Sequence, residues 1–423
     1  MITSQLYDLF IKCNGISTDT RSIQKGNLFF SLKGENFDGN KYALEAIKKG
    51  AKYAVVDSDK IENPNFIKVD DVLNSLQKLS TFHRLKLSKT KIIAITGSNG
   101  KTTTKELIKN VLNEKYKTTA TKGNLNNHIG VPLTLLQIDK NTDFAIVEMG
   151  ANHVGEIEFL TNLIKPDIGY ITNFGKAHLD GFGGIKGVIK GKSELYNWLL
   201  KNNKPILINS DDTIQSNFIN SNSITFGIKG KAKFIFKEEN NGDFLTVKYN
   251  KNKIDSNLIG SYNFNNIQAA ITLGLHFKIE IKSIKNAIKN FTPKNNRSQY
   301  IIRNNKKIIL DAYNANPTSM HLAIDSFLKY SGSKMLILGD MFELGKYSKK
   351  EHQSVIDKLD KIKIKAFLLG NEFYKLQKQS ITVLFFKTKN DLISEITKNK
   401  IEEKNILIKG SRGMKMEEVL EVI

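Results

Sequence analysis

The sequence predicts an α/β protein of more than one domain, built on parallel β-sheets. Its 423 residues exceed what one hydrophobic core ordinarily serves, so two or three domains are expected. Short apolar runs alternate with stretches of helical spacing, the pattern of strands joined by crossover helices. The clearest unit is the apolar run Ile92 to Ile95, which a glycine turn and a helical pattern from Lys105 to Leu112 follow.

The composition is that of a globular protein, with 40% hydrophobic and 25% charged residues. The N-terminus has no basic region followed by an apolar core of signal-peptide length, and no apolar run approaches the length of a membrane span. We therefore expect a cytoplasmic protein without a membrane partner. The single cysteine, Cys13, excludes an internal disulfide and a cysteine-rich zinc or iron–sulfur site.

The net charge is +22, from 64 Lys and Arg against 42 Asp and Glu, which would suit a polyanionic ligand. The basic residues are nevertheless scattered among Asn and Ile and are not interleaved with aromatic residues, as a surface for single-stranded nucleic acid requires. A Lys/Asn/Ile-rich bias explains the charge more simply, so we expect no nucleic-acid partner.

The N-terminal region reads as a small α/β unit. Between Ile16 and Asp57, short strand-like runs and turns precede a helix at Tyr42 to Lys49 and a strand at Tyr53 to Val56. The polar loops STDTR and KGENFDG could contact a nucleotide-like group through hydroxyls, Arg21 and glycine backbone, but they are as readily ordinary turns. The lysine-rich segment His83 to Thr90 is the first candidate linker.

The turn after Ile95 predicts a phosphate-binding loop. Gly97 and Gly100 let the backbone curl with its N–H groups inward, Lys101 supplies a mobile charge, and a threonine hydroxyl can hold Mg²⁺. The spacing departs from G-x-x-x-x-G-K-[ST], whose first glycine would fall at Ile95, and a glycine-rich turn with a solvated lysine is the simpler alternative. The expected phosphate-binding residues are Gly97, Ser98, Asn99, Gly100, Lys101, Thr102 and Thr103.

Two further strands bring polar side chains to the same sheet edge. The apolar run DFAIVE ends in Glu148, and a carboxylate at that position holds Mg²⁺ in phosphate-loop enzymes. The strand that begins at Asp167 leads into GKAHLDGFGG and brings His178 to this edge. A lone histidine is more often structural, but glycines flank this one beside two other candidate magnesium-site elements, which favours a functional role.

Several motifs occur in one order along the chain: TGSNGKTT, GNLNNHIGVPLTLL, VEMGANHVGEI, NFGKAHLDGFG and KSELY. Together they resemble the Mur ligase superfamily of ATP-dependent amide-bond-forming enzymes, whose shortened phosphate loop accounts for the missing first glycine. GSYNFNN resembles the segment that meets the adenine side of ATP, although Tyr262 stands where the superfamily commonly has histidine. The resemblance spans nearly the whole chain.

The C-terminal motifs DAYNANPTSM, LGDMFELG and KGSRGMKME narrow the resemblance to the branch that adds D-alanyl-D-alanine to UDP-N-acetylmuramoyl-tripeptide. Relatives that add diaminopimelate or lysine have an arginine-containing signature in place of the asparagine–proline pair of NANP. Folate-tailing relatives are not expected to have the N-terminal unit with STDTR and GENFDG. The resemblance thus implies a ligase of peptidoglycan precursor synthesis that works through an acyl phosphate.

The resemblance also implies roles for particular residues. It implies ATP contacts at the phosphate loop and at Asn263, Asn266, Arg297, Asp311 and Asn314. It implies substrate contacts at Ser17, Thr18, Arg21, Asn126, Asn127 and Asn316. It implies two Mg²⁺ ions held by Thr102, Glu148, His178 and Lys192, and catalytic roles for Lys101, Glu148, His178, Lys192 and Arg297. From the sequence alone, Lys192 would be interpreted as one more solvated lysine. The resemblance implies instead that it corresponds to the site of a lysine carbamate in the superfamily.

The expected layout has three α/β domains in a monomer. Residues 1–85 hold the UDP-sugar end of the substrate, residues 86–297 bind ATP, and residues 298–423 form a Rossmann-like domain that receives the dipeptide. The strands expected in this last domain are Lys306 to Leu310, Lys334 to Leu338, Ala366 to Leu369 and Asn405 to Ile408. The alternative function is a phosphate-loop ATPase or switch protein that makes no bond; whether the tripeptide carries diaminopimelate or lysine is left open.

Overall fold

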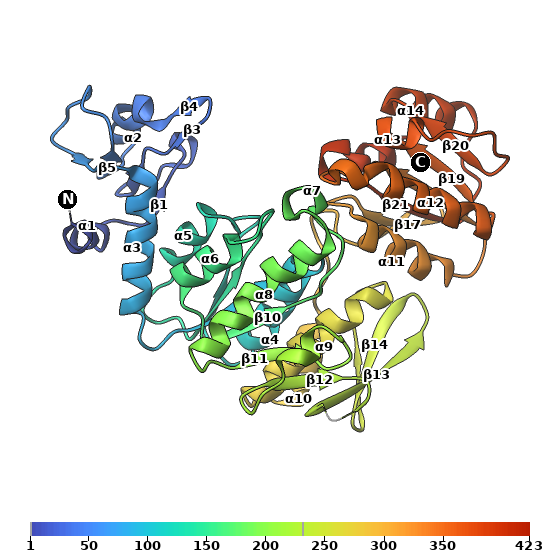
Figure 1. Cartoon of the computed structure of the whole chain (residues 1–423), viewed down its shortest axis with the longest axis horizontal. Coiled ribbons are helices and arrows are strands. Elements are labelled where there is room, and N and C mark those ends of the chain that lie inside the picture. Colours follow the sequence, from blue (N-terminus) through green and yellow to red (C-terminus); the bar gives the residue numbers. More distant parts are fainter. Residues whose placement is uncertain (1, 231) are drawn as a thin grey trace.

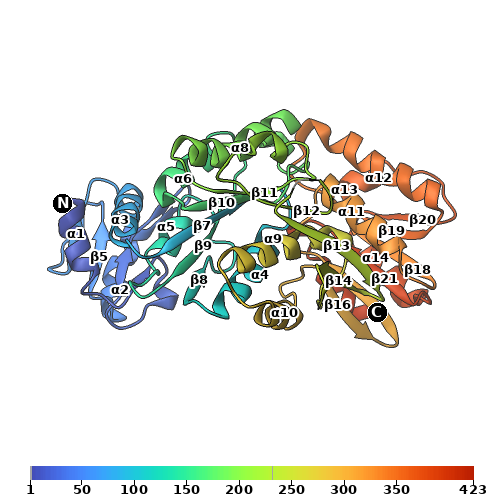
Figure 2. The same ribbon diagram turned by 90° about the horizontal axis from the view of Figure 1, so that it is seen from below.

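The computed structural model describes residues 2–230 and 232–423, which form three lobes (Figure 1). The N-terminal and C-terminal lobes lie at opposite ends of the central lobe in both views (Figures 1 and 2). Each lobe is built around a sheet of its own. The expected α/β architecture is therefore confirmed.

The N-terminal lobe has a parallel sheet of order β1-β2-β5-β6 and a small antiparallel pair, β3-β4. The strand expected at Tyr53 to Val56 is β5, and the expected helix begins as a tight turn before α2. Its elements are α1 (Thr3–Phe10), β1 (Ile16–Ser17), β2 (Leu28–Phe30), β3 (Lys33–Gly34), β4 (Phe37–Asp38), α2 (Ala43–Lys48), β5 (Tyr53–Val56), β6 (Phe66–Lys68) and α3 (Val72–Lys86).

The linker prediction at His83 to Thr90 is wrong for its first half, because α3 continues to Lys86. His83 is buried, its Nε2 lies 2.8 Å from the carbonyl oxygen of Ile138, and its ring packs against Phe10. The expected linker is therefore replaced in part by α3, which packs on both the N-terminal and the central lobe. Residues 87–90 connect α3 to β7 (Lys91–Thr96), the first strand of the central lobe.

The central lobe has a sheet of order β15-β14-β13-β12-β11-β10-β7-β9-β8. It is parallel from β8 to β13, and the β13-β14-β15 segment adds an antiparallel extension. Its elements are β7 (Lys91–Thr96), α4 (Lys101–Asn113), β8 (Thr118–Ala120), α5 (Gly130–Leu135), β9 (Phe144–Glu148), α6 (Glu156–Ile164), β10 (Ile168–Ile171), α7 (Leu179–Phe182), α8 (Ile185–Lys201), β11 (Ile206–Asn209), β12 (Ile224–Gly227), β13 (Phe234–Asn241), β14 (Phe244–Tyr249), β15 (Asn252–Asp255), α9 (Phe264–His276) and α10 (Ile281–Lys289).

Strand β7 is the centre of this lobe. It pairs with β9 on one side and β10 on the other, and Ile92 to Ile95 are fully buried. Because alternate residues of a strand face opposite sides, Ile93 and Ile95 pack against α4, α9 and α10, whereas Ile92 and Ala94 pack against α5, α6 and α8. Both faces are covered, which explains the unbroken apolar run of the sequence.

The C-terminal lobe has a sheet of order β16-β17-β21-β18-β19-β20, parallel except for the antiparallel edge strand β16. The expected strands are present as β17, β18, β19 and β21, and β16 and β20 are additions. Its elements are β16 (Gln299–Arg303), β17 (Lys306–Asp311), α11 (Pro317–Leu328), β18 (Lys334–Gly339), α12 (Ser348–Ile362), β19 (Lys365–Leu369), α13 (Asn371–Tyr374), β20 (Val383–Phe386), α14 (Lys389–Lys398) and β21 (Asn405–Lys409).

Two of the contacts between the central and C-terminal lobes lie on opposite sides of their interface. Where β14 begins, Asp243 accepts hydrogen bonds from Tyr300 (3.0 Å) and Lys307 (2.5 Å). On the other side, beyond β10, Lys176 forms an ion pair with Glu351 of α12 at 2.7 Å. These contacts hold the carboxyl ends of the two parallel sheets toward each other, where ligand sites of such sheets lie.

No helix among residues 2–230 and 232–423 combines the length and the apolar character that a membrane span requires.

Candidate active site

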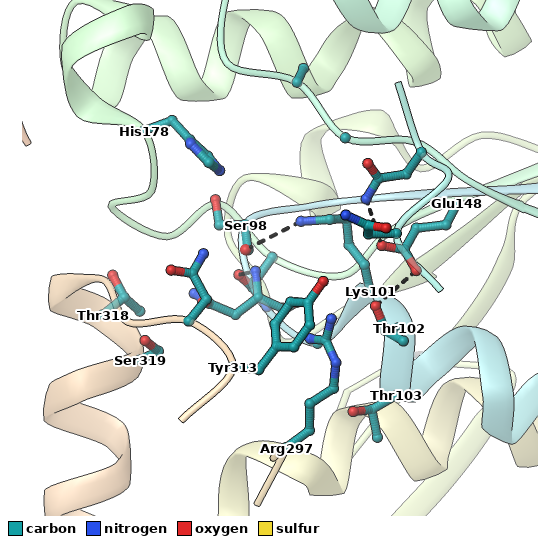
Figure 3. Close-up of a pocket in the computed structure, with 18 of the residues that line it drawn as sticks. Ser98, Lys101, Thr102, Thr103, Glu148, His178, Arg297, Tyr313, Thr318 and Ser319 are labelled. Carbon is teal, nitrogen blue, oxygen red and sulfur yellow. Dashed lines mark hydrogen bonds between the residues drawn. The ribbon is translucent and has the colours of Figure 1, made fainter. Parts of the chain in front are cut away.

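A pocket of about 1010 Å³ lies between the central and C-terminal lobes. It is lined by the phosphate loop, by the segments that follow β9 and β10, by the start of α9, and by the segment that follows β17 (Figure 3). Of the residues expected in the site, Ser98, Asn99, Gly100, Lys101, Thr102, Thr103, Asn126, Asn127, Glu148, His178, Asn263, Asn266, Arg297, Asp311 and Asn314 line it. The chain folding thus brings together motifs that are more than 200 residues apart.

The loop between β7 and α4 has the expected curled backbone. Gly97 has φ +137°, and a Cβ atom there would lie 2.0 Å from Oγ1 of Thr172, so only glycine fits. Gly100, with φ +80°, stands at the N-terminus of α4. The side chain of Asn173 accepts a hydrogen bond from the Asn99 N–H at 3.1 Å and donates one to its carbonyl oxygen at 2.9 Å, which fixes the loop to the end of β10.

Lys101 lies inside this loop. Its Nζ donates a 2.7 Å hydrogen bond to the carbonyl oxygen of Gly97. Desolvation lowers the pKa of Lys101, the Glu148 carboxylate opposes this shift, and the Arg297 guanidinium adds to it. Lys101 and Arg297 together place positive charge around the loop, the arrangement that a polyphosphate requires.

Glu148 ends β9 beside the phosphate loop. Its side chain is 2% exposed. Oε2 accepts a 2.9 Å hydrogen bond from the Thr102 hydroxyl, and Oε1 accepts one of 2.9 Å from the Asn126 amide. Lys105, fully buried one turn further along α4, has its Nζ 3.6 Å from Oε2. Three partners therefore fix the carboxylate that the sequence predicts as a metal ligand.

Arg297 and the segment after β17 close the pocket from the C-terminal side. The Arg297 guanidinium stacks on the Tyr313 ring, with Cζ 3.4 Å from the ring centroid (Figure 3). Asp311 Oδ2 accepts a 2.6 Å hydrogen bond from Lys409, which is 1% exposed and also donates to the carbonyl oxygen of Asn314 at 3.2 Å. Lys409 thus fixes the positions of Asp311 and Asn314, two of the residues predicted to contact ATP, relative to each other.

Tyr262, the departure from the family pattern, joins this network. Its hydroxyl lies 2.8 Å from Oγ of Ser298, whose backbone N–H donates to Asp311 at 3.1 Å. Burial raises the pKa of Tyr262, so the phenol stays neutral. The neighbouring amides form a second chain, in which Asn266 donates to Asn263 at 2.8 Å and accepts from Thr104 at 3.0 Å. The start of α9 is thereby attached to α4.

His178 faces the pocket from the opposite side. It immediately precedes α7, with a left-handed backbone at φ +51°, and its ring points into the pocket in Figure 3. Its Nδ1 lies 2.5 Å from Oε2 of Glu343, a residue of the C-terminal lobe. The adjacent His178 ring is the main reason that the pKa of Glu343 lies below its ordinary value.

Lys192 does not line the pocket but lies directly behind its wall. The side chain is 1% exposed, and Nζ donates to the carbonyl oxygen of Ala151, a lining residue, at 3.3 Å. Nζ also lies over the Phe182 ring, 5.1 Å from its centroid. Burial, followed by the Lys101 ammonium, lowers the pKa of Lys192 well below its ordinary value. A solvated surface lysine is therefore excluded.

Four of the expected substrate-binding residues are not in the pocket. Ser17, Thr18 and Arg21 lie in the N-terminal lobe, where Arg21 forms an exposed ion pair with Asp19 at 2.6 Å. Asn316 is buried beside the pocket and uses both side-chain atoms: its amide donates to Asn99 at 2.7 Å, and its oxygen caps α11. It joins the two lobes here, and its role as a substrate contact stays a prediction.

Lys105, Tyr313, Glu343 and Lys409 were not predicted as site residues. Tyr313, Glu343 and Lys409 each lie within a motif that carries the family resemblance, which was the available signal. Lys105 follows the phosphate loop at the spacing of one helical turn from Lys101, so its side chain was predictable as a neighbour of that lysine.

The residues present fit Mg²⁺ on the Thr102 side of the pocket. The Glu148 carboxylate and the Thr102 hydroxyl offer the oxygen ligands that Mg²⁺ prefers, and phosphate oxygens and water ordinarily complete such a site. Over the described residues, no group of three or more His, Cys, Asp or Glu side chains converges as a metal cage. An unmodified Lys192 ammonium does not fit a second ion beside His178, whereas a carbamate on the same stem would.

Comparison with known proteins agrees with this geometry. Residues 12–84 match the model of the Mur ligase family catalytic domain, residues 95–274 that of the Mur ligase middle domain, and residues 296–412 that of the Mur ligase glutamate ligase domain. The UDP-N-acetylmuramoyl-tripeptide--D-alanyl-D-alanine ligase of Bacillus subtilis (strain 168) is 35% identical, over 96% of this chain and 92% of the relative. The chain belongs to the Mur ligase family.

Other relatives support the same branch of the Mur ligase family. The corresponding ligase of Buchnera aphidicola subsp. Acyrthosiphon pisum (strain APS) is 35% identical, over 98% of this chain and 94% of its own length. A crystal structure of MurF from Acinetobacter baumannii is 28% identical with a TM-score of 0.88, covering 99% of this chain and 97% of the other. The expectation of an ATP-dependent Mur ligase with this architecture is confirmed.

Proposed function

We propose that this Mur ligase joins D-alanyl-D-alanine to the free carboxylate of UDP-N-acetylmuramoyl-tripeptide, with ATP as the energy source. The pocket carries the proposal, because the phosphate loop, the Thr102–Glu148 pair and the Arg297–Tyr313 stack meet there from two lobes. The names of the full-length relatives supply the two substrates. Since the tripeptide is a nucleotide-linked precursor, we propose a cytoplasmic site of action.

The reaction proceeds in two displacements. A carboxylate oxygen of the tripeptide attacks the γ-phosphorus of ATP, ADP leaves, and an acyl phosphate forms. The amino nitrogen of the dipeptide then attacks the acyl carbon, phosphate leaves, and the amine loses a proton. Lys101 stabilises the charge that develops on the transferred phosphoryl group, and Arg297 does so from the lobe junction.

The residues around the pocket divide this work. Thr102 and Glu148 would hold one Mg²⁺, and His178 with a carbamylated Lys192 would hold a second. Mg²⁺, when bound, neutralises phosphate and carboxylate charge so that the two anions can approach. Asp311, Asn314, Asn263 and Asn266 are proposed to orient the nucleotide. Asn126 and Asn127, which line the pocket, are proposed to contact the substrate.

The three lobes suggest a division of binding. We propose that residues 1–85 hold the UDP-sugar through Ser17, Thr18 and Arg21, that residues 86–297 bind ATP, and that residues 298–423 receive the dipeptide. The exposed Arg21 guanidinium is suited to a diphosphate, because its present partner is an exposed carboxylate that a ligand can replace. The enzyme is proposed to act as a monomer.

Phosphate release should require both the UDP-tripeptide and the dipeptide. Purified protein with ATP and Mg²⁺ should release phosphate only when UDP-N-acetylmuramoyl-tripeptide and D-alanyl-D-alanine are both present, because the acyl phosphate turns over by attack of the amine. Product mass, measured with the diaminopimelate and the lysine tripeptides in parallel, identifies the preferred substrate. Hydrolysis at the same rate without either substrate would favour a phosphate-loop ATPase or switch protein.

Ligand binding should close the lobes. The ATP side of the pocket belongs to the central lobe and Asp311, Asn314 and Arg297 to the junction and the C-terminal lobe, so chemistry requires them together. Small-angle scattering should show a smaller radius of gyration with nucleotide and UDP-tripeptide than with either alone. An unchanged radius with all ligands bound would contradict gating by closure.

A further inference from the structure

The loop of residues 340–347 is fixed firmly to the C-terminal lobe. Asp340 is buried, and its carboxylate accepts hydrogen bonds from the backbone N–H groups of Glu372 (2.9 Å) and Phe373 (3.0 Å) in α13. The N–H of Met341 donates to Nε2 of the fully buried His352 at 3.0 Å. This loop therefore moves with its lobe as one body.

The same loop contacts the turn around α7 in the central lobe. Glu343 Oε2 lies 2.5 Å from Nδ1 of His178, and the Glu343 carbonyl oxygen accepts a 3.3 Å hydrogen bond from the N–H of Asp180. The Tyr347 hydroxyl donates to the carbonyl oxygen of Gly183 at 3.3 Å. In Figure 1, α7 is the part of the central lobe that reaches toward the C-terminal lobe.

Both partners of the Glu343–His178 contact have unusual backbones. Glu343 has φ +61° and His178 has φ +51°, the left-handed region that residues with a Cβ atom rarely adopt. Neither position has the glycine that would make this conformation inexpensive. Such conformations persist where the surroundings demand them, and they concentrate at functional sites.

The contact bears on the orientation of the imidazole. Glu343 Oε2 lies 2.5 Å from Nδ1, although the two groups are not aligned as a hydrogen bond requires. A carboxylate only accepts hydrogen bonds, so a ring turned to complete this bond has its proton on Nδ1 and keeps the lone pair on Nε2. Metal-binding histidines are ordinarily oriented by such a carboxylate on the other ring nitrogen. We propose that Glu343 is a positioning residue, which orients His178 from the C-terminal lobe and so completes this side of the active site only when the lobes are closed.

This inference deepens the proposed function and rests on it, because it assigns His178 to the ligase site. Stability is a poor explanation of the contact. The side chains of Glu343 and His178 are 56% and 23% exposed, and ion pairs this open to solvent contribute little to folding. We therefore assign the Glu343 carboxylate the role of orienting the His178 ring.

The first test compares Glu343→Gln with Glu351→Gln. Both variants neutralise an acidic residue of the C-terminal lobe that contacts the central lobe. The partner of Glu343, His178, lines the pocket, whereas the partner of Glu351, Lys176, does not. Glu343→Gln should lower kcat by about 10–100-fold, as losses of a carboxylate behind a metal ligand do, with KM changed little. Glu351→Gln should keep kcat near the wild-type value. Equal kcat in the two variants, both with wild-type Tm, would overturn the proposal.

The second test needs neither Mg²⁺ nor turnover. Protein labelled with ¹⁵N in its histidine rings is measured by NMR at about pH 8.5, where a free imidazole is neutral, alone and with ADP and UDP-tripeptide. His178, assigned with a His178→Asn variant, should have its proton on Nδ1 in at least the ligand complex. In Glu343→Gln it should be a mixture of tautomers, because an amide can donate as well as accept. Identical ring signals in wild type and Glu343→Gln in both samples would overturn the proposal, even if the protein proved not to be a ligase.

Discussion

Lys101→Ala should lower kcat by at least ~10²-fold while the protein folds normally, because it removes a charge that stabilises phosphoryl transfer. The lysine Nζ donates hydrogen bonds to carbonyl oxygens of its own loop, Gly97 at 2.7 Å and Ser98 at 3.4 Å, and the backbone of that loop is unchanged by the substitution. Alanine also suits the first turn of α4 by its helix propensity. Steady-state kinetics with both substrates saturating measures the effect.

Lys109→Ala is the matched control for this variant. Lys109 lies on the same helix and outside the pocket lining, so the same substitution should leave kcat near the wild-type value. Thermal unfolding should be similar in the two variants. A folded Lys101→Ala protein with near-full activity would show that the role of Lys101 is misassigned.

Glu148→Ala should cause a loss of similar size, but its effect on folding differs. The carboxylate is the partner of the fully buried Lys105, whose Nζ is 3.6 Å away, and removing it leaves that ammonium with fewer compensating contacts. Some loss of stability is therefore expected. Glu148→Gln keeps the shape and removes only the charge, so a loss of at least ~10²-fold in this variant separates the metal role from folding.

The sequence predicted the fold well where local patterns decide it. The strands β7, β9, β10, β17, β18, β19 and β21 were recognisable because parallel strands buried on both faces read as short, continuous apolar runs. The antiparallel extension β13-β14-β15 was not assigned, since exposed charged residues such as Lys237 and Lys248 interrupt its apolar pattern. The end of α3 was interpreted as a linker because it is rich in basic residues, yet His83 faces the core and Arg84, with a side chain 12% exposed, forms an ion pair with Asp167 at 2.8 Å.

The site residues that lie within one local motif were predictable from the sequence. Contacts between residues of different lobes or distant strands were less so. Lys101 and Thr102 share one turn of chain with the glycines that define the loop, and Glu148 ends the neighbouring strand. The Lys409–Asp311 pair joins positions 98 residues apart, and Glu343 approaches His178 from another lobe. No spacing rule predicts such contacts, because they depend on how two sheets are placed against each other.

Lys192 is the least expected participant, and its environment favours the proposed carbamate. Carbamylation needs a neutral amine, whose nitrogen attacks CO₂ and loses a proton to give the anion. Burial and the Lys101 ammonium lower the pKa of Lys192 well below its ordinary value, which makes the neutral amine available. The carbamate would lie behind Ala151, which lines the same pocket as His178.

Lys192→Ala should fold, lose most activity, and regain part of it when acetate or formate is added. The substitution removes a long buried side chain and leaves a cavity, and a small carboxylate can occupy the anion position there. Lys190→Ala, an exposed lysine on the same helix, should keep full activity. Chloride at equal ionic strength should not restore Lys192→Ala, and acetate should not restore Lys101→Ala. Because the carbamate is labile, a missing mass increment decides nothing, but full activity of Lys192→Ala without added carboxylate would exclude the carbamate as a metal ligand.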